Sequence, residues 1–147
     1  MYVYKIMCEF STILQLYYNT SDILSFQSNY KSTLSNFVGT SVKEEISIAS
    51  LYDIDSTQNG NIQFNNINIT RSTFPAIYKV TESISFQFDE DTQIYISNYY
   101  KSNTEYYPDG SKYIIPIISC TGKYLGREGY VVIDAESDKR YITIGLY

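Results

Sequence analysis

Residues 113–133 read YIIPIISCTGKYLGREGYVVI, and this stretch decides the fold. Its first apolar run ends at a turn that contains Gly122, and a second apolar run begins at Gly129. The polar residues 134–138 then lead into residues 139–147, KRYITIGLY, where apolar and polar side chains alternate. Short apolar runs separated by glycine-containing turns are typical of antiparallel strands. The stretch therefore predicts a strand, a turn, a second strand and a C-terminal strand.

The rest of the chain shows the same strand pattern. Side chains alternate between apolar and polar with the period of two that a half-buried strand requires. Clusters of Asn, Asp, Ser, Gly and Pro, which favour turns, separate these runs. The upstream segments predicted as strands are residues 2–10, 12–18, 23–27, 44–51, 77–88 and 93–100.

Two local predictions can be tested in detail. Residues 28–43 are rich in Ser and Asn and predict a loop that holds one edge strand at most. In residues 44–51, the alternation predicts that Ile46 and Ile48 face inward while Glu45 and Ser47 face outward.

The following segment predicts a hairpin and an irregular strand. A turn is predicted at residues 53–61, which contain Asn59-Gly60, the dipeptide best suited to a tight hairpin turn. The apolar parity then changes between Phe64 and Ile67, which predicts a β-bulge at Asn65-Asn66.

About eight to ten short strands, with turn signals every eight to twelve residues and no helical pattern, indicate an all-β protein. We predict a single antiparallel β-barrel of about eight strands, with a β-sandwich or jelly roll as the alternative. No internal repeat or linker divides the sequence, so residues 1–147 are predicted to form a single β domain.

The turn within the opening stretch resembles the signature of the dirigent and allene-oxide-cyclase-like barrels. The resemblance is carried by Thr121-Gly122, Tyr124 and Gly129, whereas Ser119-Cys120 replaces the paired glycines of that family. It implies a barrel whose glycines permit positive φ and close backbone approach at the connections between neighbouring strands. No catalytic residue of the family can be matched to a position in this sequence.

Composition excludes several classes of function. The net charge is −5, from 11 basic and 16 acidic residues, which disfavours nucleic acids and anionic membranes as partners. No apolar stretch is long enough for a transmembrane helix, and the N-terminus lacks a signal-peptide pattern. We therefore expect an intracellular or virion location. The chain has no histidine, which excludes His-dependent triads and most catalytic zinc sites, and we predict no catalytic residue, no metal site and no cofactor.

The acidic and cysteine residues give no stronger candidate for a functional site. The spacing of Asp53, Asp55 and Asn59 fails the calcium-loop pattern, and residues 89–91 are predicted to be a charged hairpin turn. Lys123, Arg127 and Glu128 are predicted to be exposed on the turn. Cys8 and Cys120 are predicted to be buried thiols, with a disulfide between them as the alternative.

Tyrosines are the candidate binding residues. The chain has 17 of them, and tyrosine is enriched at protein interfaces, although it also suits cross-strand packing on a sheet. The predicted partner-binding positions are Tyr99, Tyr100, Tyr106, Tyr107 and Tyr147.

Two hypotheses for function follow. The first is a non-enzymatic structural or protein-interaction barrel, a subunit of a larger homo- or hetero-oligomeric assembly such as a virus particle. Heavy use of Ile, Asn and Tyr without Trp, a bias of AT-rich genomes that include large DNA viruses, favours it. The second is a dirigent-like barrel that binds and orients a small apolar molecule. The barrel interior separates them, because a binder needs an open cavity with convergent polar groups and a structural module should be filled with apolar side chains.

Overall fold

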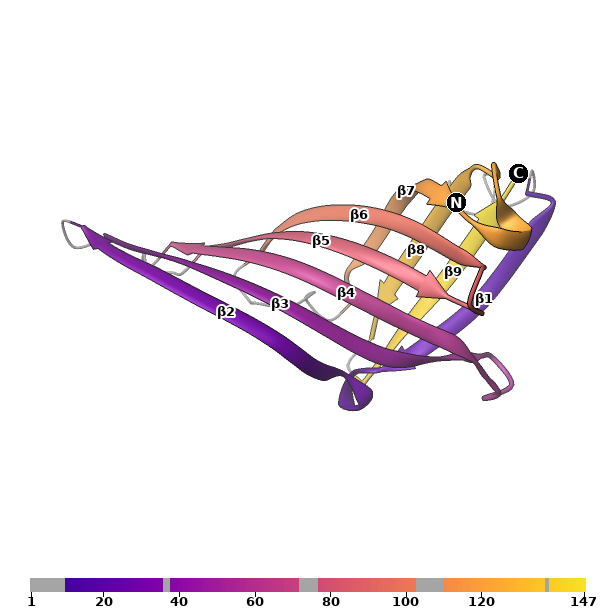
Figure 1. Ribbon diagram of the computed structural model, residues 1–147, viewed down its shortest axis with the longest axis horizontal. Helices are drawn as coiled ribbons and strands as arrows, with labels where there is room; N and C mark the ends of the chain where they lie inside the picture. Colours follow the sequence, from indigo (N-terminus) through magenta and orange to yellow (C-terminus); the bar gives the residue numbers. More distant parts are fainter. Residues whose placement is uncertain (1–9, 36–37, 72–76, 103–109, 137) are drawn as a thin grey trace.

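We describe a computed structural model of the chain, which covers residues 10–35, 38–71, 77–102, 110–136 and 138–147 (Figure 1). The elements in chain order are β1 (Thr12–Asn19), the 3-10 turn η1 (Thr20–Asp22), β2 (Leu24–Ser35), β3 (Val38–Asp53), β4 (Gln58–Arg71), β5 (Ile77–Gln87), β6 (Gln93–Ser102), β7 (Lys112–Cys120), η2 (Gly122–Tyr124), β8 (Gly129–Ala135) and β9 (Lys139–Leu146).

The strands form one antiparallel sheet in the order β1-β9-β8-β7-β6-β5-β4-β3-β2. The sheet closes on itself because the end of β3 also pairs with β1, with Leu16 opposite Asp53 and Tyr17 opposite Tyr52. The rings of Tyr17 and Tyr52 stack at 5.4 Å across this junction. The result is a closed barrel of eight strands with β2 as one extra strand, which confirms the predicted all-β barrel.

Strands β2 to β5 are longer than β7 to β9 and extend past the closed part of the barrel (Figure 1). The long β2–β3 hairpin corrects the loop predicted for residues 28–43. Its pairing runs from Leu24 opposite Ile48 to Ser35 opposite Val38, with one register shift near Ser25. Backbone hydrogen bonding therefore builds these strands where the sequence lacks apolar alternation.

The bulge predicted in β4 is wrong. The β4 register is continuous with both neighbours at Asn65 and Asn66, so the predicted bulge is absent. As a result Phe64 points inward, whereas Ile67 lies on the outer face and is partly exposed. The hairpin between β3 and β4 is confirmed, but its turn lies at residues 54–57 and Gly60 belongs to β4.

The inward and outward faces of β3 are the reverse of those predicted. Ser47 is 3% exposed and faces the interior with Ala49 and Leu51, while Ile46 and Ile48 are only half-buried. The alternation predicted the wrong faces because the inward positions of this part of β3 hold polar residues, Glu45 and Ser47, and the apolar residues lie on the other face.

Glycines act at the strand junctions as predicted for the opening stretch. Gly122 has φ +61°, and a Cβ at this position would lie 2.7 Å from the carbonyl oxygen of Asp91. A Cβ on Gly129 would lie within van der Waals radii of the Gly145 carbonyl oxygen on β9. These two glycines let the β7–β8 connection and β8 approach neighbouring backbone.

Side chains fill the interior in rows that follow the β3–β6 register. The row Ala49, Ile62, Phe86 and Ile94 is apolar. Around it pack Leu51, Val131, Ile144 and Leu146, all fully buried. We call this half of the interior the packed end; it lies on the side of the β5–β6 turn and η2.

Candidate functional site

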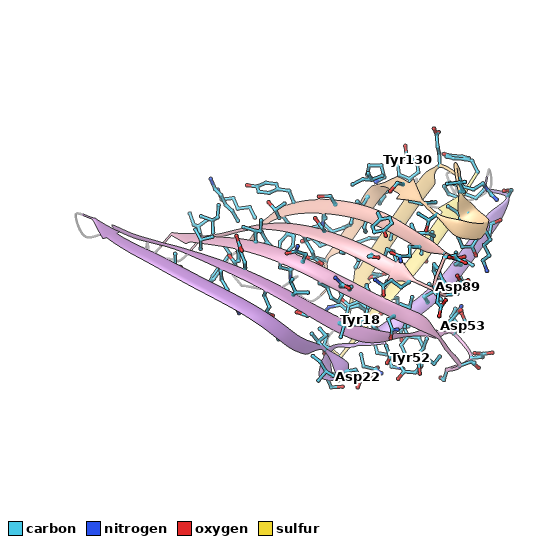
Figure 2. The ribbon with its side chains drawn as sticks, in the orientation of Figure 1. Tyr18, Asp22, Tyr52, Asp53, Asp89 and Tyr130 are labelled. Atoms are coloured by element: carbon cyan, nitrogen blue, oxygen red, sulfur yellow. The ribbon has the colours of Figure 1, made fainter. Side chains whose placement is uncertain are left out.

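A cavity of about 440 Å³ occupies the opposite half of the interior, which we call the polar end. It lies where the closed barrel meets the extended part of β2 to β6, on the side of η1. In Figure 2, Tyr18 lies on this side near Asp22, away from Asp89 in the β5–β6 turn. The lining residues come from seven strands and η1 and are Tyr18, Thr20, Ile23, Ser25, Glu45, Ser47, Phe64, Asn66, Glu82, Tyr100 and Arg140.

A row of four inward-facing polar residues runs across β3 to β6, and three of them, Glu45, Asn66 and Glu82, line the cavity. Register places Glu45 opposite Asn66, Asn66 opposite Glu82, and Glu82 opposite Asn98. All four share the inward parity of the apolar row, two layers further along each strand. We call Glu45, Asn66, Glu82 and Asn98 the polar row. Carboxyl and amide groups therefore alternate across four adjacent strands.

Two buried charged side chains of the cavity come from opposite walls. Glu82 on β5 is 2% exposed and Arg140 on β9 is 7% exposed. Both charges act on the Tyr18 hydroxyl: Glu82 favours its neutral form and Arg140 favours its ionised form. Charges buried to this extent require compensation inside the protein, so their placement in a cavity is a functional signal.

Tyr18 is opposite Arg140 in the β1–β9 register and has its ring edge-on to Phe64 at 5.3 Å. Burial raises the pKa of Tyr18 well above its ordinary value; the negative charge of Glu82 raises it further, and Arg140 partly offsets the effect. The phenol is therefore neutral at ordinary pH and can donate a hydrogen bond.

Glu45 is ionised and already has partners. Its carboxylate lies 2.8 Å from Lys43 Nζ, and Ser47 Oγ donates to Glu45 Oε1 at 3.3 Å. The hydrogen bond from Lys43 holds the pKa of Glu45 below its ordinary value, partial burial opposes this, and Ser25 and Ser47 contribute further hydrogen bonds.

Two hydrogen bonds to backbone carbonyls of the β8–β9 turn fix one edge of the cavity. The Thr20 N–H donates to the Asp138 carbonyl at 3.1 Å, which links η1 to the β8–β9 turn. The Arg140 guanidinium donates to the carbonyl of Glu136 in the same turn. These contacts hold Arg140 and Thr20 at the edge of the cavity.

One polar atom in the polar row lacks a partner. Asn66 Oδ1 is buried and accepts no hydrogen bond from any residue that the structure describes. An amide oxygen in this state costs free energy unless a donor reaches it.

The predicted partner-binding tyrosines are dispersed. Tyr99 is 59% exposed on the outer face of β6, and Tyr147 is 47% exposed with its ring 4.7 Å from that of Phe10. Tyr100 is 6% exposed, lines the cavity and has its ring 5.8 Å from Tyr113. Tyr106 and Tyr107 lie outside the described residues. A tyrosine-mediated protein interface stays a prediction.

The acidic turns form hydrogen bonds within themselves. Asp53 Oδ1 accepts from Asn59 Nδ2 at 2.7 Å, and Asp89 Oδ1 accepts the backbone N–H groups of Asp91 and Thr92 at 2.9 and 2.7 Å. Hydrogen bonds to backbone N–H groups hold the pKa of Asp89 below its ordinary value. Within the described ranges, no group of three or more His, Cys, Asp or Glu residues could hold a metal ion.

Arg127 is held by hydrogen bonds within the fold, and Cys120 is buried. Arg127 hydrogen bonds the Leu146 carbonyl at 3.3 Å and the Ser11 and Tyr147 oxygens, so it ties the η2 turn to β1 and the C-terminus. Cys120 is a free buried thiol whose pKa is raised by burial, and Cys8 lies outside the described residues.

Sequence reasoning missed the polar row, although the signal is present. Glu82 has the same parity as Ile84 and Phe86 in β5, and Arg140 has the same parity as Ile142 and Ile144 in β9. A charged residue in the apolar register of a strand indicates a buried charge. Asn66 was not recognised as an inward residue because a bulge was predicted at its position in β4.

The chain matches no protein-family model and no curated protein. Among solved structures it is similar to a pyocyanin demethylase, with a TM-score of 0.51 and 13% sequence identity, over 92% of this chain and 100% of that chain. At this identity the similarity concerns the fold, a closed antiparallel barrel. Among the described residues, no helix is long and apolar enough to cross a membrane.

Proposed function

We propose that this protein binds a small, largely aromatic or apolar molecule in the cavity at the polar end of the barrel. The observation that carries the proposal is the cavity itself, which falls within the range of about 300–1,000 Å³ typical of small-molecule sites. Its lining combines the rings of Tyr18, Phe64 and Tyr100 with a few convergent polar groups, as such sites require.

Two further observations support a binding role. The pyocyanin demethylase of similar fold is named for its action on a small molecule. The resemblance of residues 121–129 to the dirigent and allene-oxide-cyclase-like barrels would also imply a small apolar ligand. The structural-subunit hypothesis needs an interior filled with apolar side chains, whereas this cavity contains Glu82 and Arg140. A role in an assembly or a virion stays a prediction.

The test is a binding titration with N-phenyl-1-naphthylamine, whose fluorescence rises in an apolar site, and with pyocyanin, followed by quenching of tyrosine fluorescence. Ser47→Leu places extra carbon atoms in the cavity. Ser83→Leu is the matched control, because Ser83 lines a separate groove of about 300 Å³ on the outer face of β4 to β7.

We expect saturable binding of at least one probe to the wild-type protein, loss of that binding in Ser47→Leu, and normal binding in Ser83→Leu. Failure of both probes to bind would refute the proposal. Binding that is lost in Ser83→Leu and kept in Ser47→Leu would place the site in the outer groove instead.

A further inference from the structure

The outer groove lies where strand β7 separates from β6. The β6–β7 register shifts at this point: Ser119 lies opposite Tyr95, and Ile117 lies opposite Ile96. Ile118 is therefore one extra residue on β7, a β-bulge, and its side chain is 65% exposed. Bulges redirect a side chain and are frequent next to active sites.

The groove, of about 300 Å³, cuts into the barrel wall beside this bulge. The described pairs of β6 and β7 end with Ile96 opposite Ile117, whereas β6 continues to Ser102. Ile84 and Ile96 are almost fully buried, yet both line the groove. The groove is therefore a recess between separating strands, and its volume lies at the lower end of the range for small-molecule sites.

The rim of the groove is polar and uncharged. It is formed by outward-facing amide and hydroxyl side chains on three adjacent strands, namely Gln63, Asn65, Ser83, Ser85 and Ser97. Asn65, Ser83 and Ser97 form one row across β4, β5 and β6, and all three are exposed. Of the described residues that line the groove, none is Lys, Arg, Asp or Glu. Amides and hydroxyls both donate and accept hydrogen bonds, so this rim suits a neutral ligand rich in hydroxyl groups.

Tyr95 supplies an aromatic surface inside this rim. It lies in the row next to that of Ser83, between Ser85 and Ser119, and it is half-buried. Its hydroxyl donates to Gln93 Oε1, and Ser85 Oγ donates to the same oxygen at 3.3 Å. These hydrogen bonds hold the ring in place before a ligand binds, which lowers the entropic cost of binding.

A ligand for this groove needs an apolar face for the Tyr95 ring and neutral polar groups around its edge. A charged compound would find no opposite charge among the described lining residues, and a wholly apolar one would leave the amides and hydroxyls of the rim without hydrogen bonds. A pyranose sugar has the required character, because one face of its ring presents C–H groups and its edge carries hydroxyls.

We infer that the outer groove binds a neutral pyranose unit, with the C–H face of the sugar against Tyr95 and its hydroxyls hydrogen-bonded to the rim. This site is separate from the cavity, so the inference goes beyond the proposed function and does not depend on it.

Isoleucine methyl NMR tests the inference in a titration with the methyl pyranosides of glucose, galactose, mannose and N-acetylglucosamine. Sorbitol is the control compound, because it carries similar hydroxyls without a ring. We expect saturable shifts of the Ile118 methyl groups with at least one pyranoside, little change at Ile23 in the cavity, and no saturation with sorbitol.

Substitutions of tyrosine locate the binding. Tyr95→Ala removes the aromatic surface and should weaken the binding of that pyranoside by about tenfold. Tyr95→Phe keeps the ring and should retain most of the affinity. Tyr99→Ala is the matched control, because Tyr99 lies on the same face of β6 outside the groove, and it should bind like the wild type. Thermal melts verify folding, and Tyr95→Phe compared with Tyr99→Ala remains informative if Tyr95→Ala does not fold.

Two serine variants separate the outer groove from the cavity. Ser83→Leu fills the groove and should abolish pyranoside binding while N-phenyl-1-naphthylamine still binds; Ser47→Leu should do the reverse. If no pyranoside binds, if sorbitol binds equally well, or if Tyr95→Ala or Ser83→Leu binds the sugar like the wild type, the inference is wrong and the cavity function is untouched. Failure of the cavity probes to bind would refute the proposed function and leave the pyranoside result intact.

Discussion

The packed end and the polar end of the interior share β3 to β6 and β9, and along these strands they differ in which residues occupy the inward positions. Along β5, Phe86 and Ile84 give way to Glu82, and along β3, Leu51 and Ala49 give way to Ser47 and Glu45. The β3–β4 and β4–β5 pairings keep one register from the row of Ala49 to the row of Glu45. A barrel can therefore divide its interior into a part that stabilises the fold and a part that is free to bind.

The packed end and the polar end should also differ in how substitutions change the free energy of unfolding. A filled interior resists any change of volume, because close-packed side chains have no space to move into. A cavity lined by polar groups tolerates added volume but loses stability through poorly satisfied polar atoms. The two ends should therefore respond to different extents when the same kind of substitution adds volume.

The largest effect is expected at the packed end. Phe86→Ala removes a fully buried ring and should lower the free energy of unfolding by about 4 kcal/mol. The measurement is urea denaturation followed by circular dichroism. Thr81→Ala on the exposed face of the same strand is the control and should stay within about 0.5 kcal/mol of the wild type. Equal effects at the two positions would contradict the division of the interior.

Overpacking should distinguish two positions on β3 that are one layer apart. Ala49→Leu adds volume to a close-packed row and should cost about 2 kcal/mol in unfolding free energy. Ser47→Leu adds similar volume beside the cavity and should show little overpacking cost, so that its loss of stability should be about 1 kcal/mol, from the hydrogen bond that Ser47 Oγ donates to Glu45. Denaturation midpoints of the two variants provide the comparison, and a larger loss for Ser47→Leu would show that the cavity cannot accept extra carbon.

Alkaline pH should destabilise the polar end through Tyr18. Its pKa is raised in the folded protein, so above the ordinary tyrosine value of about 10 the folded state keeps a proton that the unfolded chain releases. The unfolding free energy therefore falls as pH rises above about 10, by up to about 1.4 kcal/mol per pH unit from this residue. Below that pH the contribution is fully present.

The variant Tyr18→Phe removes this titration. Its unfolding free energy, measured by urea denaturation from pH 9 to 11, should decline less steeply than that of the wild type. Parallel curves for the two proteins would contradict the buried, neutral state assigned to Tyr18.

The smallest effect concerns Asn66 and has the opposite sign. Asn66→Leu removes a buried amide oxygen that has no partner among the described residues, so it should raise the unfolding free energy by about 1 kcal/mol. Asn68→Leu is the contrasting variant, because Asn68 is buried and has an interaction partner, and it should be destabilising. A loss of stability in Asn66→Leu would show that this amide is satisfied in solution.

Much of the fold follows from local pattern. Alternation and turn residues predict the hairpin of β5 and β6 and the succession of β7, β8 and β9, because each strand there has one apolar face. The β2–β3 hairpin was missed, since its strands are held by pairing with neighbours and carry no apolar stripe. Closure through residues 16–17 and 52–53 depends on the curvature of the whole sheet, which no local pattern contains.

The candidate site was less accessible to prediction. Its residues are far apart in the sequence, from Tyr18 to Arg140, and only the register of several strands places them around one cavity. Glu82 could have been detected, because it interrupts an apolar face. Asn66 could not, because the apolar residues Ile67 and Ile69 on the outer face suggested the opposite parity.

The central claim is that one end of the barrel is filled and the other accepts a ligand, and isoleucine methyl NMR tests it most directly. Ile23 lines the cavity, Ile94 belongs to the packed row, and Ile118 lines the outer groove. On titration with N-phenyl-1-naphthylamine, we predict saturable shifts of the Ile23 methyl groups with little change at Ile94 and Ile118. Shifts confined to Ile118, or no shift at any of the three, would contradict the account.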